Sequence, residues 1–140
     1  MKYKVIITAG GTSEKIDNVR KITNSSTGKL GCTIANKIIQ LHEEQIEKIY
    51  YICSKNSFKP AHNKIEIIEI TDTNELEKTV RSLLTSNDIH YFIHSMAVSD
   101  YTVDYVTTAE SLALSINNNS NKNVIYLICE HNDNLTYNKI

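Results

Sequence analysis

Several features are scarce in this sequence of 140 residues, and each absence narrows the possibilities. There is no tryptophan, one proline and four glycines. Three cysteines, Cys32, Cys53 and Cys129, stand far apart, with no CxxC or HExxH pattern. This argues against a disulfide framework and against a structural zinc site. We expect three buried thiols in a reducing compartment.

Long apolar runs and clusters of one charge are also missing. No run approaches the roughly 18–20 residues of a membrane helix, and the apolar stretch at the N-terminus is too short for a signal peptide. We expect no membrane partner and a cytoplasmic location. The net charge is -1, but residues 1–60 carry ten Lys/Arg and five Asp/Glu. Because no basic cluster of five or more occurs, this charge favours a small anionic ligand over a nucleic acid.

Hydrophobic periodicity predicts alternating strands and helices. Apolar, β-branched runs predict strands at 3–8, 48–53, 64–70 and 91–94. Apolar residues spaced three or four apart predict two helices. The first runs from about Gly28 to His42 and is capped by Ser26 or Thr27. The second begins with Asp72 and Glu75, which form a variant of the capping box. This order indicates an α/β class: a Rossmann-like three-layer fold with a mostly parallel sheet.

The expected fold occupies the whole chain as one domain, residues 1–140. Four strands are few for a doubly wound sheet, so we expect the fold to be incomplete at its C-terminal end. Residues 124–129 are apolar and are a candidate further strand. Around them, residues 116–138 hold eight asparagines, a composition more typical of loops.

The first candidate site is the stretch of about twenty residues between the first strand and the first helix. Such loops usually have about 2–6 residues, and longer ones are often functional. Gly10 and Gly11 let backbone amides approach a ligand, since they carry no Cβ. Residues 24–28 place hydroxyls and amides at a helix N-terminus, which suits phosphate. The alternative is a structural turn before a capped helix. Nearby cations are Arg20, Lys21 and Lys29.

The second candidate is the segment from Ile93 to Tyr101, which follows the fourth strand. In a parallel sheet its end lies beside the first loop. Asp100 is predicted either to contact a ribose hydroxyl or a metal-bound phosphate, or to cap the next segment. His94 is interpreted as a half-buried strand residue rather than a base, and Met96 as a packing residue.

Together these segments resemble phosphopantothenate–cysteine ligase, an enzyme family of coenzyme A biosynthesis. The family's opening pattern, G-G/P-T-x-E-x-I/L-D-x-V-R followed by x-I-T/S-N-x-S-[ST]-G-x-x-G, is matched between Gly10 and Gly31. Its second pattern, A-V-[AS]-D-[YF], is matched at residues 97–101. The resemblance runs from about Lys4 to Tyr105 and is closest to the short stand-alone bacterial forms. The matched positions of the first pattern are Gly11–Glu14, Asp17, Val19, Arg20, Asn24–Gly28 and Gly31.

The resemblance implies a two-step reaction. CTP activates the carboxylate of 4'-phosphopantothenate as an acyl nucleotide, with Mg²⁺ assisting and pyrophosphate leaving, and the amine of L-cysteine then forms the amide. Asn24 and the amide of Ala97 are implied to act at the acyl group, and Arg20 and Asn24 to contact the substrate. The implied nucleotide- and phosphate-binding residues are Gly10, Gly11, Thr12, Ser26, Thr27, Gly28 and Asp100.

The family's chain continues into a lysine-bearing flap, which often begins K-I. Lys139 and Ile140 resemble its start, so Lys139 is implied as catalytic and residues 106–140 as a flap and dimerisation segment. We therefore expect an N-terminal portion of the ligase that binds phosphates without completing the reaction alone. A homodimer and a functional link to a separate phosphopantothenoylcysteine decarboxylase are also implied.

Two alternatives belong to other functional classes. A nicotinamide-dependent oxidoreductase needs a GxGxxG fingerprint and an acid at the end of the second strand, and residues 52–55 supply no acid. A degenerate ligase half that acts as a phosphate-binding or association module remains open, because the expected flap is not present in full.

Overall fold

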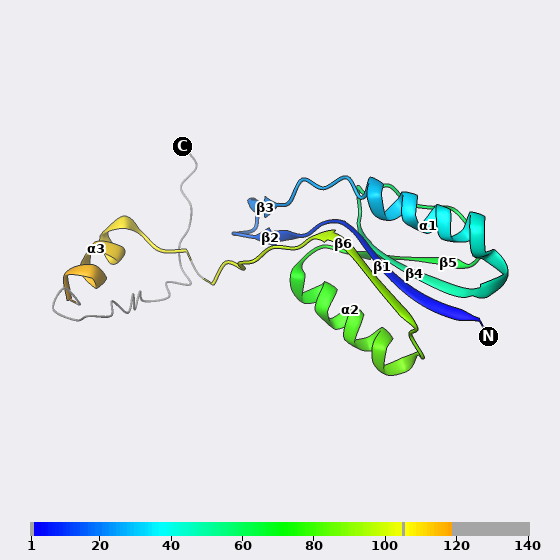
Figure 1. Ribbon diagram of the computed structural model, residues 1–140. Helices are drawn as coiled ribbons and strands as arrows, with labels where there is room; N and C mark the ends of the chain where they lie inside the picture. Colours follow the sequence, from blue (N-terminus) through cyan, green and yellow to red (C-terminus); the bar gives the residue numbers. More distant parts are fainter. Residues whose placement is uncertain (1, 105, 119–140) are drawn as a thin grey trace. The chain divides into compact units, whose positions relative to one another are not determined.

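The first strand, β1 (Tyr3–Gly11), lies inside a parallel four-stranded sheet of order β5–β4–β1–β6 (Figure 1). It pairs with β4 (Ile46–Ser54) and with β6 (Tyr91–Ala97), and β4 also pairs with β5 (Ile65–Ile70). The run Val5–Ile7 is buried throughout. A β-branched run without polar alternation is typical of a parallel strand that is covered on both faces.

The computed structural model describes residues 2–104 and 106–118. The chain divides into two compact units, Met1–Thr102 and Val103–Ile140. The sheet and its flanking helices belong to the first unit.

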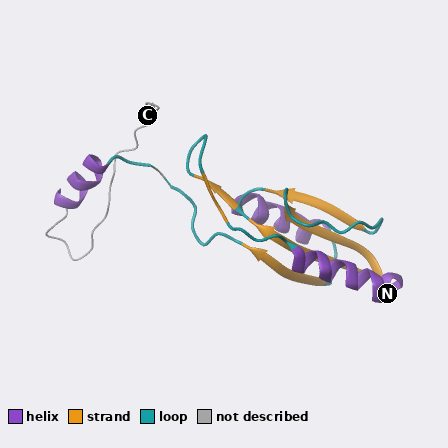
Figure 2. Cartoon of the chain, turned by 90° about the horizontal axis from the view of Figure 1, so that it is seen from above, coloured by secondary structure: helices purple, strands orange, loops and turns teal. Residues whose placement is uncertain are grey.

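Two helices cover opposite faces of the sheet. Ala35 of α1 (Lys29–His42) packs with Val5 and Ile7, whereas Leu76 of α2 (Thr73–Ser86) packs with Ile6. Figure 1 shows one helix on each side of the sheet, and Figure 2 shows the same strands and helices from above. The expected α/β, Rossmann-like three-layer fold is confirmed.

The order of the strands places a topological switch point beside β1. The chain passes from β1 through α1 to β4, continues to β5, and returns through α2 to β6 on the other side of β1. The carboxyl ends of β1 and β6 flank this switch point, and they are joined by the hydrogen bond of the Thr12 amide to the Ala97 carbonyl at 3.1 Å. Open α/β sheets bind ligands in the crevice at this point.

The two helices begin differently. As expected, Asp72 caps α2: its Oδ1 accepts the Glu75 amide at 2.8 Å, and Glu75 Oε2 accepts the Thr71 amide at 2.7 Å. The expected cap of α1 by Ser26 or Thr27 is wrong. Its N-cap is Gly28, with φ at 72° and no side chain of its own, although Thr27 Oγ1 accepts the Lys29 amide at 3.4 Å. The first amides of α1 are consequently less satisfied by the protein than those of α2.

The stretch expected as a long loop contains a small antiparallel hairpin. Its strands are β2 (Ser13–Lys15) and β3 (Lys21–Thr23). The hairpin extends beyond the carboxyl ends of the sheet (Figure 1). Three-residue strands are too short for an alternating pattern to be recognised in the sequence. A short 3-10 turn, η1 (Glu43–Gln45), links α1 to β4.

The described part of the second unit contains one helix, α3 (Ala109–Asn118). Thr108 Oγ1 accepts the Ser111 amide at 3.2 Å at its start. The sequence analysis did not predict this helix. The candidate strand at 124–129, Cys129 and Lys139 lie outside the described residues. Within the described residues, every helix is too short or too polar to cross a lipid bilayer.

Cys53 is expected to resist alkylation in the folded protein. Its side chain is fully buried, and burial raises the pKa of its thiol to about 11. At pH 8 the thiolate fraction is then about 100-fold below that of a thiol with an ordinary pKa near 9. Iodoacetamide labelling with peptide mass mapping should modify Cys53 only after urea is added. Rapid labelling of Cys53 in the native protein would contradict this packing.

Candidate functional site

The carboxyl ends of the parallel strands surround an open pocket of about 440 Å³. Its walls come from the ends of β1, β4 and β5, the hairpin strand β3, and the turn before α1. The segments predicted from the sequence to hold an anion therefore meet in one place. The lining residues are Gly11, Ser13, Lys21, Thr23, Asn24, Ser25, Ser26, Thr27, Ser54, Lys55, Asn56, Ile70 and Thr71.

Thr12 links the segments at the switch point. It is fully buried directly after β1, and its amide donates to the Ala97 carbonyl at 3.1 Å. Its carbonyl accepts the Asn24 amide at 3.0 Å, and its Oγ1 accepts the Ser99 amide at 2.9 Å. These bonds hold the end of β6 and the turn before α1 against the end of β1. The predicted role of Thr12 in phosphate binding stays a prediction.

Asn24 and Ala97, both predicted to act at the acyl group, lie together although they are 73 positions apart. The Asn24 Nδ2 donates to the Ala97 carbonyl at 3.3 Å and to Ser99 Oγ at 3.2 Å. The Ala97 carbonyl also accepts the Thr12 amide, so it keeps a partner if the Asn24 amide turns one proton toward a ligand oxygen. The side chain is half-buried and lines the pocket.

Gly10 and Gly11 are required by close approaches within the protein. Gly10 has φ at 87°, and a Cβ there would overlap the hydroxyls of Ser54 and Ser57. A Cβ on Gly11 would overlap the Asn24 carbonyl oxygen. The missing side chains thus let two segments, the loop after β4 and the turn before α1, approach the end of β1 closely. This explains the glycine pair without a ligand, and its predicted part in binding remains a prediction.

The loop after β4 is a component that the sequence analysis missed. Ser54 Oγ lies 2.7 Å from Ser57 Oγ and 3.3 Å from the Gly11 amide. The hydroxyl of the buried Tyr51 donates to the Phe58 carbonyl at 2.9 Å, which ties this loop to the core. The available signal was the polar run after a predicted parallel strand, because all such strand ends meet at one edge of the sheet.

The pocket favours an anion. Its lining residues include two lysines, Lys21 and Lys55, and no carboxylate. Ser26 and Thr27 lead to Gly28 and the first amides of α1, where the helix end carries partial positive charge. Hydroxyls of the serine and threonine side chains add neutral donors. This combination suits phosphate or carboxylate oxygens.

Arg20 lies in the hairpin turn and is held by Asp17. Asp17 Oδ1 accepts the amides of Val19 and Arg20 at 2.8 and 2.7 Å, and its Oδ2 accepts from the Arg20 guanidinium at 2.8 and 2.6 Å. The backbone hydrogen bonds, followed by the guanidinium, hold the pKa of Asp17 below its usual value. At neutral pH the charged pair therefore fixes the orientation of Arg20.

Four further residues singled out in the sequence occupy distinct positions. Glu14 is buried, and its Oε1 accepts both the amide and the hydroxyl of Thr73, at 2.9 and 2.6 Å, so it fixes the hairpin to the start of α2. Asp100 is exposed beyond the end of β6. His94 lies on β6 as expected, but it is exposed rather than half-buried, with Nδ1 at 2.6 Å from Thr8 Oγ1. Met96 is buried, as expected. The described residues contain no cluster of three or more potential metal ligands from His, Cys, Asp and Glu.

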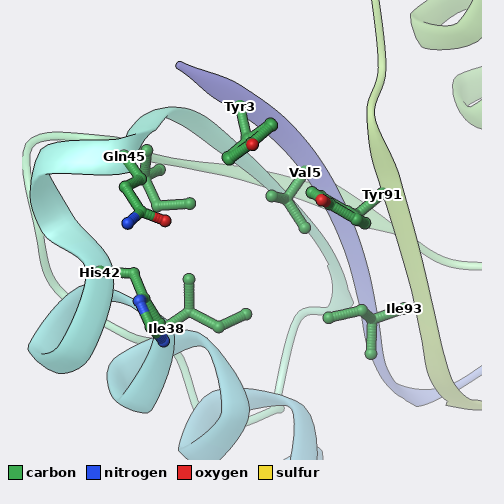
Figure 3. Close-up of a pocket in the computed structure, with 8 residues that line it drawn as sticks. Tyr3, Val5, Ile38, His42, Gln45, Tyr91 and Ile93 are labelled. Atoms are coloured by element: carbon green, nitrogen blue, oxygen red, sulfur yellow. The ribbon is translucent and has the colours of Figure 1, made fainter. Parts of the chain in front are cut away.

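A second pocket, of about 200 Å³, lies at the opposite end of the strands (Figure 3). Tyr3 and Tyr91, the first residues of β1 and β6, form one wall, and Ile38 and His42 of α1 form the other. The Tyr3 and Tyr91 rings meet edge to face, with centroids 5.3 Å apart. This pocket is mainly apolar and contains none of the residues predicted for the site.

Comparisons with known proteins identify the family of the chain. The family model for the C-terminal domain of the DNA/pantothenate metabolism flavoprotein matches residues 1–135. The coenzyme A biosynthesis bifunctional protein CoaBC of Bacillus subtilis is 35% identical over 98 residues, and that of Thermococcus kodakarensis is 32% identical over 100 residues. These alignments cover 70% and 71% of this chain but 23% of each relative.

Solved structures show the same fold. The DNA/pantothenate metabolism flavoprotein from Streptococcus pneumoniae is 42% identical, with a TM-score of 0.64 over 71% of this chain and 42% of that one. The C-terminal domain of a CoaBC protein is 27% identical, with a TM-score of 0.62 over 81% of this chain and 57% of that one. The chain therefore spans about a quarter of the curated relatives it matches and about half of these solved structures.

Proposed function

Because this chain belongs to the family of the DNA/pantothenate metabolism flavoprotein C-terminal domain, we propose that it acts in coenzyme A biosynthesis as a phosphopantothenate–cysteine ligase. The observation that carries the proposal is the contact of Asn24 with Ala97 and Ser99, beside a pocket lined by lysines and hydroxyls. Acyl activation needs polar donors at a carboxylate and an adjoining site for phosphates, and this arrangement offers both.

In the proposed first step, the carboxylate of 4'-phosphopantothenate lies beside Asn24 and the amide of Ala97. One of its oxygens attacks the α-phosphorus of CTP, the bond to the β-phosphate breaks, and pyrophosphate leaves. Lys21, Lys55 and the amides before α1 would stabilise the phosphate charge. The further predicted nucleotide contacts are Gly10, Gly11, Thr12, Ser26, Thr27, Gly28 and Asp100.

In the second step the amine of L-cysteine attacks the acyl carbon and forms the C–N bond. The C–O bond between the acyl carbon and the phosphate oxygen breaks, CMP leaves with its electron pair, and the amine loses a proton to water. The side chain of Asn24 would donate to the acyl oxygen as negative charge develops on it. Arg20, which Asp17 holds in a fixed orientation, is proposed to contact the anionic substrate. Lys139 keeps its proposed catalytic role, although it lies outside the described residues.

Mg²⁺ is proposed to enter with the nucleotide. Magnesium is often held by substrate phosphates together with one or two carboxylates. Asp100, exposed at the carboxyl end of the sheet, offers one such carboxylate. The ion would neutralise phosphate charge, while the protein residues described above orient the two substrates.

We further propose a homodimer and a functional link to a phosphopantothenoylcysteine decarboxylase, which would consume the product. On α3 the apolar side chains of Leu112, Leu114 and Ile116 are exposed, which fits a helix that buries apolar surface on association. Sedimentation equilibrium should show a dimer at micromolar concentrations. A monomer throughout that range would contradict the dimer.

The proposed function is tested by titration and by turnover. Calorimetric titrations should show binding of CTP with Mg²⁺ and of 4'-phosphopantothenate to the purified chain, and Lys21→Gln with Lys55→Gln should weaken CTP binding. Lys37→Gln, on the outer side of α1, is the matched control. Pyrophosphate release that requires both compounds would establish the first step. Because this chain is expected to bind phosphates without completing the reaction alone, turnover is also measured in a longer form of the protein. Binding without turnover in that longer form would favour the phosphate-binding module, and binding of neither compound would refute the proposal.

A further inference from the structure

Ser99 lies at the centre of the contacts that hold the site together. Its amide donates to Thr12 Oγ1 at 2.9 Å. Its own Oγ accepts two hydrogen bonds, from Thr12 Oγ1 and from Asn24 Nδ2, each at 3.2 Å. Neither composition nor periodicity singled out this residue.

The direction of these bonds follows from burial. Thr12 is fully buried, so its hydroxyl proton has to find an acceptor inside the protein, and Ser99 Oγ is within reach. Ser99 is only half-buried. A serine hydroxyl accepts two hydrogen bonds and donates one. With both acceptor positions occupied, the Ser99 proton has no acceptor among the contacts of the described residues and is available to a ligand.

Two consequences follow for what can bind there. Donors that point at a hydroxyl oxygen polarise its O–H bond and make it a stronger donor. The atom that meets Ser99 must also be an acceptor, because the oxygen has no position left for an N–H group. A carboxylate or phosphoryl oxygen meets this requirement, and an ammonium group does not.

We propose that Ser99 donates its hydroxyl proton to an anionic oxygen of the bound substrate and so selects an acceptor at this position of the site. The inference rests on the proposed ligase function. Asn24, the partner of Ser99, is the residue proposed at the acyl oxygen, so the carboxylate of 4'-phosphopantothenate is the expected source. A phosphoryl oxygen of CTP has the same chemistry and is distinguished by the test below.

Removing the Ser99 hydroxyl takes away an acceptor of the buried Thr12 hydroxyl, so the free energy of unfolding of each variant is measured before binding is compared. The pattern A-V-[AS]-D-[YF] that residues 97–101 match accepts alanine or serine at this position, so Ser99→Ala is sterically compatible. Ser95→Ala is a matched control on β6, because the Ser95 hydroxyl already donates to the Thr8 carbonyl at 2.6 Å. Ser99→Thr keeps a hydroxyl and should restore binding.

The experiment measures dissociation constants by calorimetry for 4'-phosphopantothenate, CTP with Mg²⁺, and L-cysteine. Ser99→Ala should weaken binding of 4'-phosphopantothenate by about 10- to 100-fold, as expected for loss of a hydrogen bond to a charged group. Ser99→Thr should stay within about threefold of the wild type, and Ser95→Ala should be unchanged. If Ser99→Ala weakens binding of CTP and of inorganic pyrophosphate but not of 4'-phosphopantothenate, the acceptor is a phosphoryl oxygen.

A ligand analogue distinguishes the loss of a direct contact between Ser99 and the carboxylate from a change in the structure of the site caused by the substitution. When a methyl group replaces the carboxylate of 4'-phosphopantothenate, Ser99→Ala should bind it as tightly as the wild type does. An equal loss for acid and analogue would overturn the inference, as would unchanged binding of both 4'-phosphopantothenate and CTP by Ser99→Ala. If the wild type binds neither compound, the proposed function fails, and the inference fails with it.

Discussion

In a longer form of the protein that catalyses CTP-dependent amide formation, replacing Asn24 with alanine is expected to lower the rate by about 10²–10³-fold, equivalent to about 2.7–4 kcal/mol of barrier. The side-chain amide is positioned by the Ala97 carbonyl and by Ser99 at the switch point of the sheet. A donor at this position contributes mainly when charge develops on the acyl oxygen. Affinity for 4'-phosphopantothenate should therefore change much less than turnover. Pyrophosphate release and mass spectrometry of the amide product measure the rate.

The matched control is Asn63→Ala, an exposed residue before β5. It should leave turnover and binding unchanged. Near-native turnover in Asn24→Ala would refute the assignment of Asn24 to the acyl oxygen. Circular dichroism of both variants verifies that the fold is intact before rates are compared.

Gly10→Ala is expected to destabilise the domain by about 2–5 kcal/mol, from left-handed strain and overpacking together. The residue is buried with φ at 87°, and the new methyl group would overlap the hydroxyls of Ser54 and Ser57. Urea denaturation followed by circular dichroism measures the free energy of unfolding. An unchanged midpoint would mean that the loop after β4 does not pack on the end of β1 as described.

A rescue variant separates the two contributions. Adding Ser54→Ala and Ser57→Ala to Gly10→Ala removes the overlapping hydroxyls but leaves the backbone strain. We compare this triple variant with the Ser54→Ala, Ser57→Ala double variant. In that background Gly10→Ala should lower the free energy of unfolding by less than it does in the wild type. Full recovery would indicate that φ at this position is not restrictive.

The sequence predicts the central strands and both covering helices because their signals are local. Val5–Ile7 is a continuous β-branched run, and Asp72 with Glu75 is a cap contained within a few residues. The hairpin escapes prediction because each of its strands has three residues, stabilised by contacts such as that of Ser13 Oγ with Thr23 Oγ1 at 2.9 Å. Local pattern is informative only where the element is long enough to show a period.

The resemblance of motifs predicts which segments form the candidate site. Which residues contact one another within it depends on segments that are distant in the sequence. Gly10 and Gly11 are recognised in the sequence, but what makes them necessary is Ser57 and Asn24 approaching in space. Similarly, Ser99 is significant only because Thr12 and Asn24 donate to it from other loops. Contacts between segments far apart in the chain produce no periodic pattern in a single sequence.

The position of β1 inside the sheet has a consequence for how the chain is made. Its Thr8 pairs with Ile52 on one side and with His94 on the other, and His94 is 86 positions further along the chain. At about 5–20 residues per second, roughly 4–17 s of synthesis separate Thr8 from that second partner. During this interval the apolar strand has an unpaired edge, a state prone to aggregation. The β1 segment is thus synthesised well before it gains both of its neighbours, and such non-local pairing favours slow folding.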